Sequence, residues 1–219
     1  MRPQVDCEKI HNPMRRIADS TVRRLSLYLQ FLEEFEGEGR ETVSSAALSA
    51  RGGTTSAQVR KDLSSFGSFG KRGLGYPVAE LKRRLRDILG LDRTYRLAVV
   101  GAGKIGGALV QYGGFTDRGF QVVAVYDSDP ARIGSAIDGR TVRNVALLER
   151  ELPGLKVDIV VIATPASAAE TVAQMAVRAG VAAMLNFAPV QLAVPDSVLV
   201  RNVNMALELE ALSYALRNR

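Results

Sequence analysis

A glycine-rich loop that follows an apolar run constrains the fold of this chain most. Residues 97–106 read LAVVGAGKIG and end in G-x-G-x-x-G. The pattern alone is weak, but here it follows a predicted strand and opens a predicted helix, as dinucleotide binding requires. The first glycine permits a tight turn, the second lets the backbone approach a pyrophosphate, and the third lets the helix pack closely. We therefore expect the loop to bind a dinucleotide through Gly101, Ala102, Gly103, Lys104, Ile105 and Gly106.

An acidic residue ends the next predicted strand. Asp127 follows the apolar run at 120–126, at roughly the spacing beyond the loop that dinucleotide-binding folds use. Its carboxylate is expected to accept hydrogen bonds from both hydroxyls of the adenosine ribose. A 2′-phosphate would be repelled there, so the sequence predicts NAD(H) rather than NADP(H). The alternative is a glycine turn that serves packing only.

The second half of the chain alternates strands and helices. Strands are predicted at 97–100, 121–126, 158–163, 182–186 and 198–203, and helices at 104–112, 145–151, 167–179 and 204–217. Near-continuous apolar strands separated by helices predict a Rossmann-type, doubly wound parallel sheet that is covered on both faces. Ligands of such folds bind beyond the carboxyl ends of the strands. We expect the nicotinamide there, beside Thr164, Pro165 and Asn186.

The first half predicts a winged helix-turn-helix. Helices are expected at 20–36, 44–51 and from Thr55 onward, where Thr55 and Gln58 fit a capping box. Aromatic and apolar residues then alternate with glycine and basic residues over 67–76, which predicts a small hairpin with Lys71, Arg72 and Gly73 at its tip. Pro77 opens a last helix that ends at Gly90.

Positive charge is concentrated in this first half. The chain carries a net charge of +6, and residues 51–86 alone hold nine Lys and Arg against two acids. Such a field attracts polyanions, although a solvated basic face is the ordinary alternative. The helix-and-hairpin context favours DNA. Arg60 and Lys61 are expected in the major groove and Lys71, Arg72 and Gly73 at the minor groove or its phosphates, with further contacts from Thr55, Ser56 and Ser64.

Several function classes fit poorly. The apolar runs are too short to cross a bilayer and the first residues lack a signal-peptide core, so we expect a cytoplasmic protein. Cys7 and His11 are the only residues of their types and find no partners for a disulfide or a metal site. No catalytic base and no substrate domain stand out, so we expect no enzyme. The alternatives are an NAD-dependent oxidoreductase with an unusual N-terminal domain, and a DNA-binding regulator whose second domain is only a scaffold.

Four motifs together resemble the Rex family of bacterial redox-sensing repressors: VRKDLS at 59–64, FGxFGKRGxGY at 66–76, the loop at 101–106, and NFAP at 186–189. The resemblance covers roughly residues 20–217. It implies a homodimer that represses genes from an inverted-repeat operator when NADH is low relative to NAD⁺, and that NADH binding releases. The predicted elements divide the chain into an extension (1–19), a DNA-binding domain (20–90) and an NAD(H) domain (91–203). The resemblance implies that the last helix (204–219) is exchanged between partners.

The chain departs from the family at the start of that last helix. Family members often carry an acid where this chain has Asn204, and in some members the acid pairs with a tyrosine that matches Tyr112. The resemblance thus implies that Tyr112 belongs to the nucleotide-responsive site, whereas the charge of the acid is absent here. The last helix is also rich in apolar residues, which fits exchange between partners; packing on the chain's own sheet is the alternative.

Overall fold

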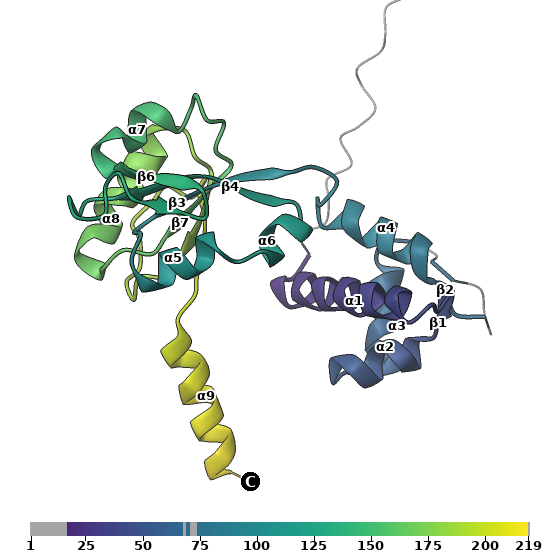
Figure 1. Ribbon diagram of the computed structural model, residues 1–219. Coiled ribbons are helices and arrows are strands. Elements are labelled where there is room, and N and C mark those ends of the chain that lie inside the picture. The colour runs from purple at the N-terminus through teal and green to yellow at the C-terminus, as the bar shows by residue number, and fades with distance from the viewer. Residues whose placement is uncertain (1–16, 68, 71–73, 219) are drawn as a thin grey trace, which may run out of the picture. The chain divides into compact units, whose positions relative to one another are not determined.

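The computed structural model describes residues 17–67, 69–70 and 74–218. The chain divides into two compact units, Met1–Asp92 and Arg93–Arg219. Figure 1 shows that the first unit is mainly helical and that the second is built on a sheet. Within the described residues, the helices are too short or too polar to span a membrane.

The first unit packs four helices around one core. They are α1 (Asp19–Gly37), α2 (Ser45–Gly52), α3 (Ser56–Ser64) and α4 (Val78–Ile88). Each helix buries residues at helical spacing, so the core joins all four: Leu25, Tyr28, Leu29, Leu32, Leu48, Val59, Leu63, Leu81 and Leu85. Two caps predicted from sequence are present, because Ser44 accepts the Ala47 amide and Thr55 accepts the Gln58 amide.

A short two-stranded sheet also belongs to this unit. Strand β2 (Tyr76–Pro77) pairs antiparallel with β1 (Thr42–Val43), which precedes α2. The hairpin expected over 67–76 falls partly on residues outside the described ones and stays a prediction. Gly75 makes this approach possible: its φ is +80°, and a Cβ there would lie 2.4 Å from the Val43 carbonyl oxygen. The predicted tip, Lys71 to Gly73, lies outside the described residues.

The second unit contains a seven-stranded sheet in the order β5-β6-β4-β3-β7-β8-β9. The strands are β3 (Tyr95–Val100), β4 (Phe120–Asp127), β5 (Ala136–Ile137), β6 (Arg140–Asn144), β7 (Ile159–Ile162), β8 (Ala183–Asn186) and β9 (Leu199–Asn202). Strand β3 lies at the centre. The strands β4, β6 and β5 extend the sheet on one side of it, and β7, β8 and β9 extend it on the other. The parallel sheet was predicted, but its edge strand β5 is antiparallel.

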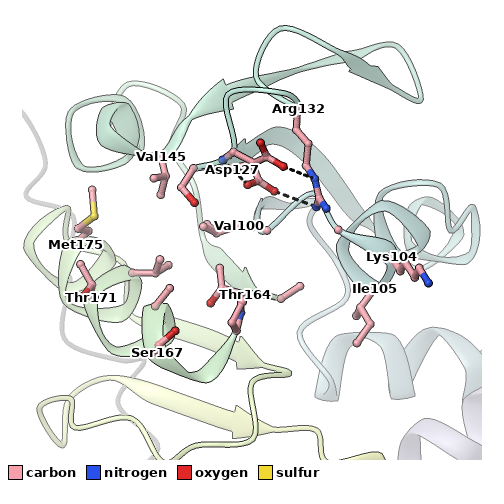
Figure 2. A pocket seen from close by; sticks show the side chains of 18 residues that line it. Val100, Lys104, Ile105, Asp127, Arg132, Val145, Thr164, Ser167, Thr171 and Met175 are labelled. Atoms are coloured by element: carbon pink, nitrogen blue, oxygen red, sulfur yellow. Dashed lines mark hydrogen bonds and ion pairs between the residues drawn. The ribbon is translucent and has the colours of Figure 1, made fainter.

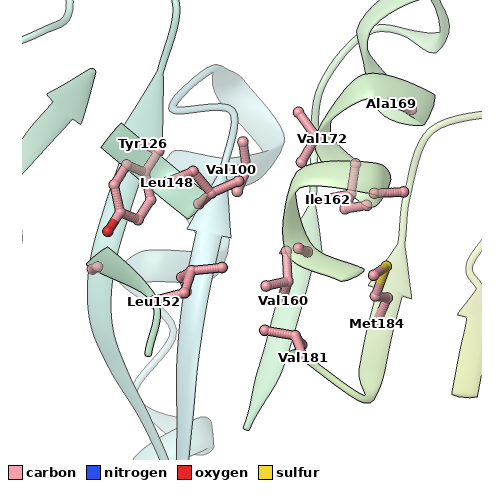
Figure 3. Close-up of a cluster of buried hydrophobic side chains, with 14 of the residues drawn as sticks. Val100, Tyr126, Leu148, Leu152, Val160, Ile162, Ala169, Val172, Val181 and Met184 are labelled. Atoms are coloured by element: carbon pink, nitrogen blue, oxygen red, sulfur yellow. The ribbon is translucent and has the colours of Figure 1, made fainter. Parts of the chain in front are cut away.

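Helices cover the two faces of this sheet, as Figure 1 shows. The alternating side chains of β3 divide between two clusters: Ala98 and Val100 pack with α7 (Leu148–Glu151) and α8 (Ala166–Arg178), as in Figure 3. Leu97 and Val99 face α5 (Lys104–Val110) and the short α6 (Gly114–Asp117), which was not predicted. A 3₁₀ turn, η1 (Val145–Leu147), precedes α7.

The last helix, α9 (Met205–Arg217), buries none of its residues. Asn204 caps it, with its side-chain oxygen accepting the Ala206 amide at 3.0 Å. Six large apolar side chains of α9 are between 58% and 73% exposed: Met205, Leu207, Leu209, Leu212, Tyr214 and Leu216. Packing of this helix on its own sheet, the alternative raised from sequence, is therefore not what the chain adopts.

Candidate functional site

A buried carboxylate anchors α3, the predicted recognition helix, to α1. Asp62 is 3% exposed and accepts hydrogen bonds from Arg24 Nε at 2.6 Å, Arg24 Nη2 at 2.8 Å and the Tyr28 hydroxyl at 3.0 Å. Burial pushes the pKa of Asp62 up, but the hydrogen bonds from Arg24, Gln58 and Tyr28 outweigh burial and hold it below its ordinary value. Sequence reasoning missed this anchor, although an acid beside the buried Leu63 was the available signal.

The same carboxylate changes the predicted capping box. Thr55 Oγ1 accepts the Gln58 amide at 3.1 Å as expected. Among the described residues the reciprocal bond, from the Thr55 amide to Gln58 Oε1, is absent; the Gln58 side chain points to Asp62, and its Nε2 donates to Asp62 Oδ1 at 2.8 Å. A buried carboxylate needs all the donors within reach, whereas an exposed backbone amide can bond to water.

The opposite side of α3 is open to solvent. Arg60, Lys61 and Ser64 are exposed, and Arg60 Nη1 donates to Ser45 Oγ of α2 at 3.1 Å. Ser64 Oγ donates to the Lys61 carbonyl of its own helix. At the start of the helix, Ser56 Oγ lies 3.2 Å from Ser49 Oγ. Of the predicted DNA contacts, the structure thus gathers Thr55, Ser56, Arg60, Lys61 and Ser64 on one short helix and its cap.

A cavity of about 790 Å³ lies in the second unit at the carboxyl ends of β3, β4 and β7 (Figure 2). This volume falls in the range of small-molecule sites, and the position is the one where doubly wound sheets bind ligands. Seven residues predicted to bind the nucleotide line it: Gly101, Gly103, Lys104, Ile105, Asp127, Thr164 and Pro165.

Each of the three glycines of the loop is required, or is useful, at its position for a different structural reason. Gly101 has a φ of +99°, and a Cβ on it would lie 2.5 Å from the Ala163 carbonyl oxygen. A Cβ on Gly106 would lie 1.7 Å from the Gly101 carbonyl oxygen, so the helix packs against the turn only without a side chain. A Cβ on Gly103 would have one near neighbour, Arg132 Nη1 at 3.1 Å, which leaves its backbone open to the cavity.

Asp127 connects the loop to the strand that follows. It is 8% exposed; its Oδ2 accepts the Ala102 amide at 2.6 Å and its Oδ1 accepts the Asp129 amide at 2.9 Å. Arg132, which sequence reasoning missed, lies with Nη1 3.5 Å from Asp127 Oδ2 and with Nε 3.3 Å from Asp129 Oδ2. A basic residue five positions after the acid was the available signal.

The far wall of the cavity comes from β7, η1 and α8. Thr164 follows β7, and its Oγ1 is buried with no hydrogen-bond partner among the described residues. Such a group is costly unless it is paired, so it is a candidate ligand contact. The wall is completed by residues that were not predicted: Val145, Ser167, Ala168, Thr171, Val172 and Met175.

Four residues expected at the nucleotide are not among those that line this cavity: Ala102 and Gly106 of the loop itself, and Asn186 and Tyr112 outside it. Asn186 is fully buried; its Nδ2 donates to the carbonyls of Ala188 and Val190 and to Asn202 Oδ1. Its polar atoms therefore hold the chain after β8 in place. Tyr112 is 60% exposed and lines a second, apolar cavity of about 750 Å³ on the α6 face of the sheet. Neither residue lines the cavity with the glycine loop.

Curated relatives align with almost the whole chain. A protein of Syntrophomonas wolfei named redox-sensing transcriptional repressor Rex is 46% identical over 206 residues, which are 93% of this chain and 98% of that protein. The repressor of the same name from Streptomyces avermitilis is 44% identical over 94% of this chain and 83% of its own. This chain belongs to the Rex family. The redox-sensing repressor family that was expected from the motifs is thus confirmed.

Family models and solved structures agree with this assignment. The model described as "Putative DNA-binding protein N-terminus" matches residues 16–64, and the one described as "CoA binding domain" matches residues 92–190. The structure of RSP with β-NAD⁺ and operator DNA has a TM-score of 0.88 at 37% identity, covering 93% of this chain and 94% of that one. RSP with β-NADH has a TM-score of 0.85 at 36% identity, covering 93% and 96%. The predicted fold class is confirmed.

Proposed function

We propose that this Rex protein binds an inverted-repeat operator as a homodimer when NADH is scarce, and that NADH in the glycine-loop cavity releases it. The observation that carries the proposal is the combination in one chain: an exposed basic recognition helix in one unit, and a cavity with a ribose-binding acid in the other. Rex-family RSP has been crystallised with β-NAD⁺ and operator DNA, and with β-NADH.

The cavity suits a dinucleotide along its whole length. Asp127 is placed to accept the adenosine ribose hydroxyls, and the loop from Gly101 to Ile105 offers backbone close to a pyrophosphate. Val145, Ala168 and Met175 provide an apolar wall for a ring system. We place the nicotinamide beside Thr164 and Pro165, where an apolar surround disfavours the positive ring of NAD⁺ relative to NADH. Bound NADH would supply the redox signal and no chemistry on a substrate.

DNA contacts are assigned to α3 and the segment that follows it. We propose that Arg60 and Lys61 enter the major groove, where a bidentate arginine–guanine pair discriminates by about 1–3 kcal/mol. Thr55, Ser56 and Ser64 would contact phosphates, and Lys71, Arg72 and Gly73 the minor groove. Asp62 keeps α3 in place from behind through Arg24 and Tyr28. Binding to DNA places the protein in the bacterial cytoplasm.

The dimer is proposed from two uncovered apolar surfaces. None of the residues of α9 is buried by the part of the chain that the structure describes. The cavity that contains Tyr112 is lined mainly by apolar residues of α6 and of the strands on the α6 face of the sheet, including Phe115, Ile159, Val161 and Leu185. Exposed apolar patches of this kind mark interfaces. We propose that residues 204–219 are exchanged between partners and pack between the DNA-binding domain (20–90) and the NAD(H) domain (91–203) of the other chain. Residues 1–19 are assigned to an extension that precedes the DNA-binding domain.

NADH and DNA must then oppose each other. By linkage, each weakens binding of the other by the same factor. A near-complete shift from the DNA-binding to the released form needs NADH to prefer the released form by about 5.5 kcal/mol. NAD⁺ must prefer it by less. Asn204 lacks the acid charge that many family members carry at this position. Any discrimination between NADH and NAD⁺ there would therefore depend on a neutral hydrogen bond between Tyr112 and Asn204.

The test is a gel shift on an inverted-repeat operator with NADH and NAD⁺ titrated separately. NADH should release the DNA at concentrations where NAD⁺ does not. Operator affinity that is unchanged at saturating NADH would refute the proposal, and a chain that binds DNA but no nucleotide would favour the scaffold alternative.

An oxidoreductase remains the second candidate class. The residues that line the cavity include no histidine and no tyrosine to serve as a proton donor beside the nicotinamide. We therefore propose that the protein is not an enzyme. Steady-state oxidation of NADH with carbonyl substrates is the discriminating assay, and turnover would overturn this assignment.

A further inference from the structure

Arg132 is the cation that faces the ribose end of the cavity. Its Nη1 lies 3.5 Å from Asp127 Oδ2, and a Cβ on Gly103 would be 3.1 Å from the same nitrogen. The guanidinium therefore stands between the acid that ends β4 and the glycine loop. Lys104, the other cation of the lining, points away from this acid in Figure 2, whereas Arg132 points toward it.

This pair combines the recognition groups of two different nucleotides. A carboxylate after the second strand binds the free 2′-hydroxyl of NAD(H), whereas an arginine nearby accommodates the 2′-phosphate of NADP(H). Arginine suits phosphate because its planar donors bind two oxygens at once and it stays charged. In this chain both groups are present, and two carboxylates hold the guanidinium: Asp127 Oδ2 lies 3.5 Å from Nη1, and Asp129 Oδ2 lies 3.3 Å from Nε. Only Asp127 is also tied to the glycine loop, through the Ala102 amide.

The carboxylate is also the better fixed of the two. Asp127 is held by the amides of Ala102 and Asp129 and is 8% exposed, whereas the Arg132 side chain is 44% exposed. A 2′-phosphate would have to approach the buried negative charge of Asp127 to reach the more exposed guanidinium of Arg132. Asp127 is therefore the residue expected to decide against a 2′-phosphate.

We propose that Asp127 and Arg132 form a selector for the adenosine ribose, in which Asp127 blocks a 2′-phosphate site that Arg132 already supplies. Neutralising Asp127 converts the cavity from NADH to NADPH binding, and the gained affinity depends on Arg132. The inference rests on the proposed nucleotide binding and adds which residue pair sets the choice of nucleotide.

The experiment titrates NADH and NADPH, by nicotinamide fluorescence, into the full chain and five variants. Asp127→Asn should weaken NADH at least tenfold and strengthen NADPH at least tenfold. The double variant Asp127→Asn/Arg132→Gln should lose the NADPH gain. Arg150→Gln, which removes an exposed arginine of α7 outside the cavity lining, is the charge-matched control and should leave both affinities unchanged.

The fourth variant, Arg132→Gln alone, keeps the test open if Asp127 variants misfold, which circular dichroism would show. Without its cation the site should reject NADPH more strongly than the unaltered chain does, at a smaller cost to NADH. Asp127→Ser is a second replacement that keeps a hydroxyl acceptor for the Ala102 amide. Coenzyme A, which carries a 3′-phosphate, is titrated in parallel, and a gain for coenzyme A in place of NADPH would overturn the 2′ assignment.

The outcomes separate this inference from the proposed function. An unaltered chain that does not bind NADH refutes the proposed function itself. An unaltered chain that binds NADH, together with an Asp127→Asn variant whose NADPH affinity is no better, refutes the selector alone. A gain in NADPH affinity that survives in the double variant also refutes it, because Arg132 would then play no part.

Discussion

Asp62→Asn is expected to loosen the recognition helix by removing a buried charge while keeping the shape of the side chain. Asp62 accepts two hydrogen bonds from Arg24 and one each from Tyr28 and Gln58. An asparagine offers one oxygen, and its amide nitrogen would face donors. Losing one partner of a buried ion pair costs about 3–5 kcal/mol. The Arg24 side chain is 27% exposed and regains some hydration, so we expect the lower end, about 3 kcal/mol.

This loss should appear as a lower melting temperature of the first unit. For a domain of this size, 1 kcal/mol corresponds to about 4–8 °C, so the midpoint should fall by roughly 12–24 °C. Operator affinity should fall as well, while NADH affinity should persist because the cavity lies in the other unit. Thermal melts, gel shifts and NADH titrations of the full chain are the assays. Asp87→Asn, an exposed acid of α4, is the control and should shift the midpoint little.

The acid side of the pH profile gives an independent check of the same reasoning. Because the folded pKa of Asp62 lies below its ordinary value of 3.8, its stabilisation is present above that value and is lost as pH falls through the folded pKa. The unaltered chain should therefore lose stability in this acid window, and Asp62→Asn should lose less. A melting temperature of Asp62→Asn within a few degrees of the unaltered chain would refute the argument.

Three further predictions concern other parts of the molecule. Gly106→Ala should abolish NADH binding or destabilise the second unit, because the new Cβ would lie 1.7 Å from the Gly101 carbonyl oxygen. The control is Gly107→Ala, whose added Cβ meets nothing within 4 Å, so calorimetry should find saturable NADH binding by that variant. Equal NADH binding by both variants would contradict the packing argument. Leu212→Glu should shift the chain toward monomers in sedimentation velocity, since Leu212 is 60% exposed on α9, and an unchanged dimer would remove α9 from the interface. Burial and the Asp62 hydrogen bond raise the pKa of Tyr28 to about 12, so the stability that this raised pKa contributes is present below pH 10 and should be lost as pH rises to 12. Tyr28→Phe should lack this alkaline loss when both proteins are unfolded by denaturant at several pH values. A parallel loss in both proteins would contradict this assignment to Tyr28.

Much of the fold could be predicted because its signals are local. Strand alternation, capping residues and the glycine loop placed most elements of both units within a few residues. The edge hairpin was missed although Asp138 and Gly139, with φ of 49° and 72°, form the two-residue turn that an Asp-Gly pair favours. The pairing of Tyr76 with Val43 depends on chain segments far apart in sequence, which periodicity does not report.

The sites were predictable where a motif fixes a backbone shape. The glycine loop and Asp127 line the cavity because their spacing is set by one strand–turn–helix unit. The α8 wall was missed since it reaches the cavity by folding of the whole sheet, whereas Arg132 lies in the turn directly after β4 and was missed although its spacing from Asp127 is local. Asn186 was expected at the nucleotide from its place at a strand end, but it is fully buried, and its Nδ2 donates to two carbonyls of the turn at 186–190 and to Asn202 Oδ1 of β9.

The uncovered side of α9 has a consequence for the amount of protein that a cell must make. Six large apolar side chains in water are a target for chaperones and proteases until the second chain of the proposed dimer covers them. Newly made chains that do not meet one another should be cleared, so the surviving pool should rise more steeply than synthesis. Gene dosage would then set a threshold below which no operator is occupied, whatever the redox state.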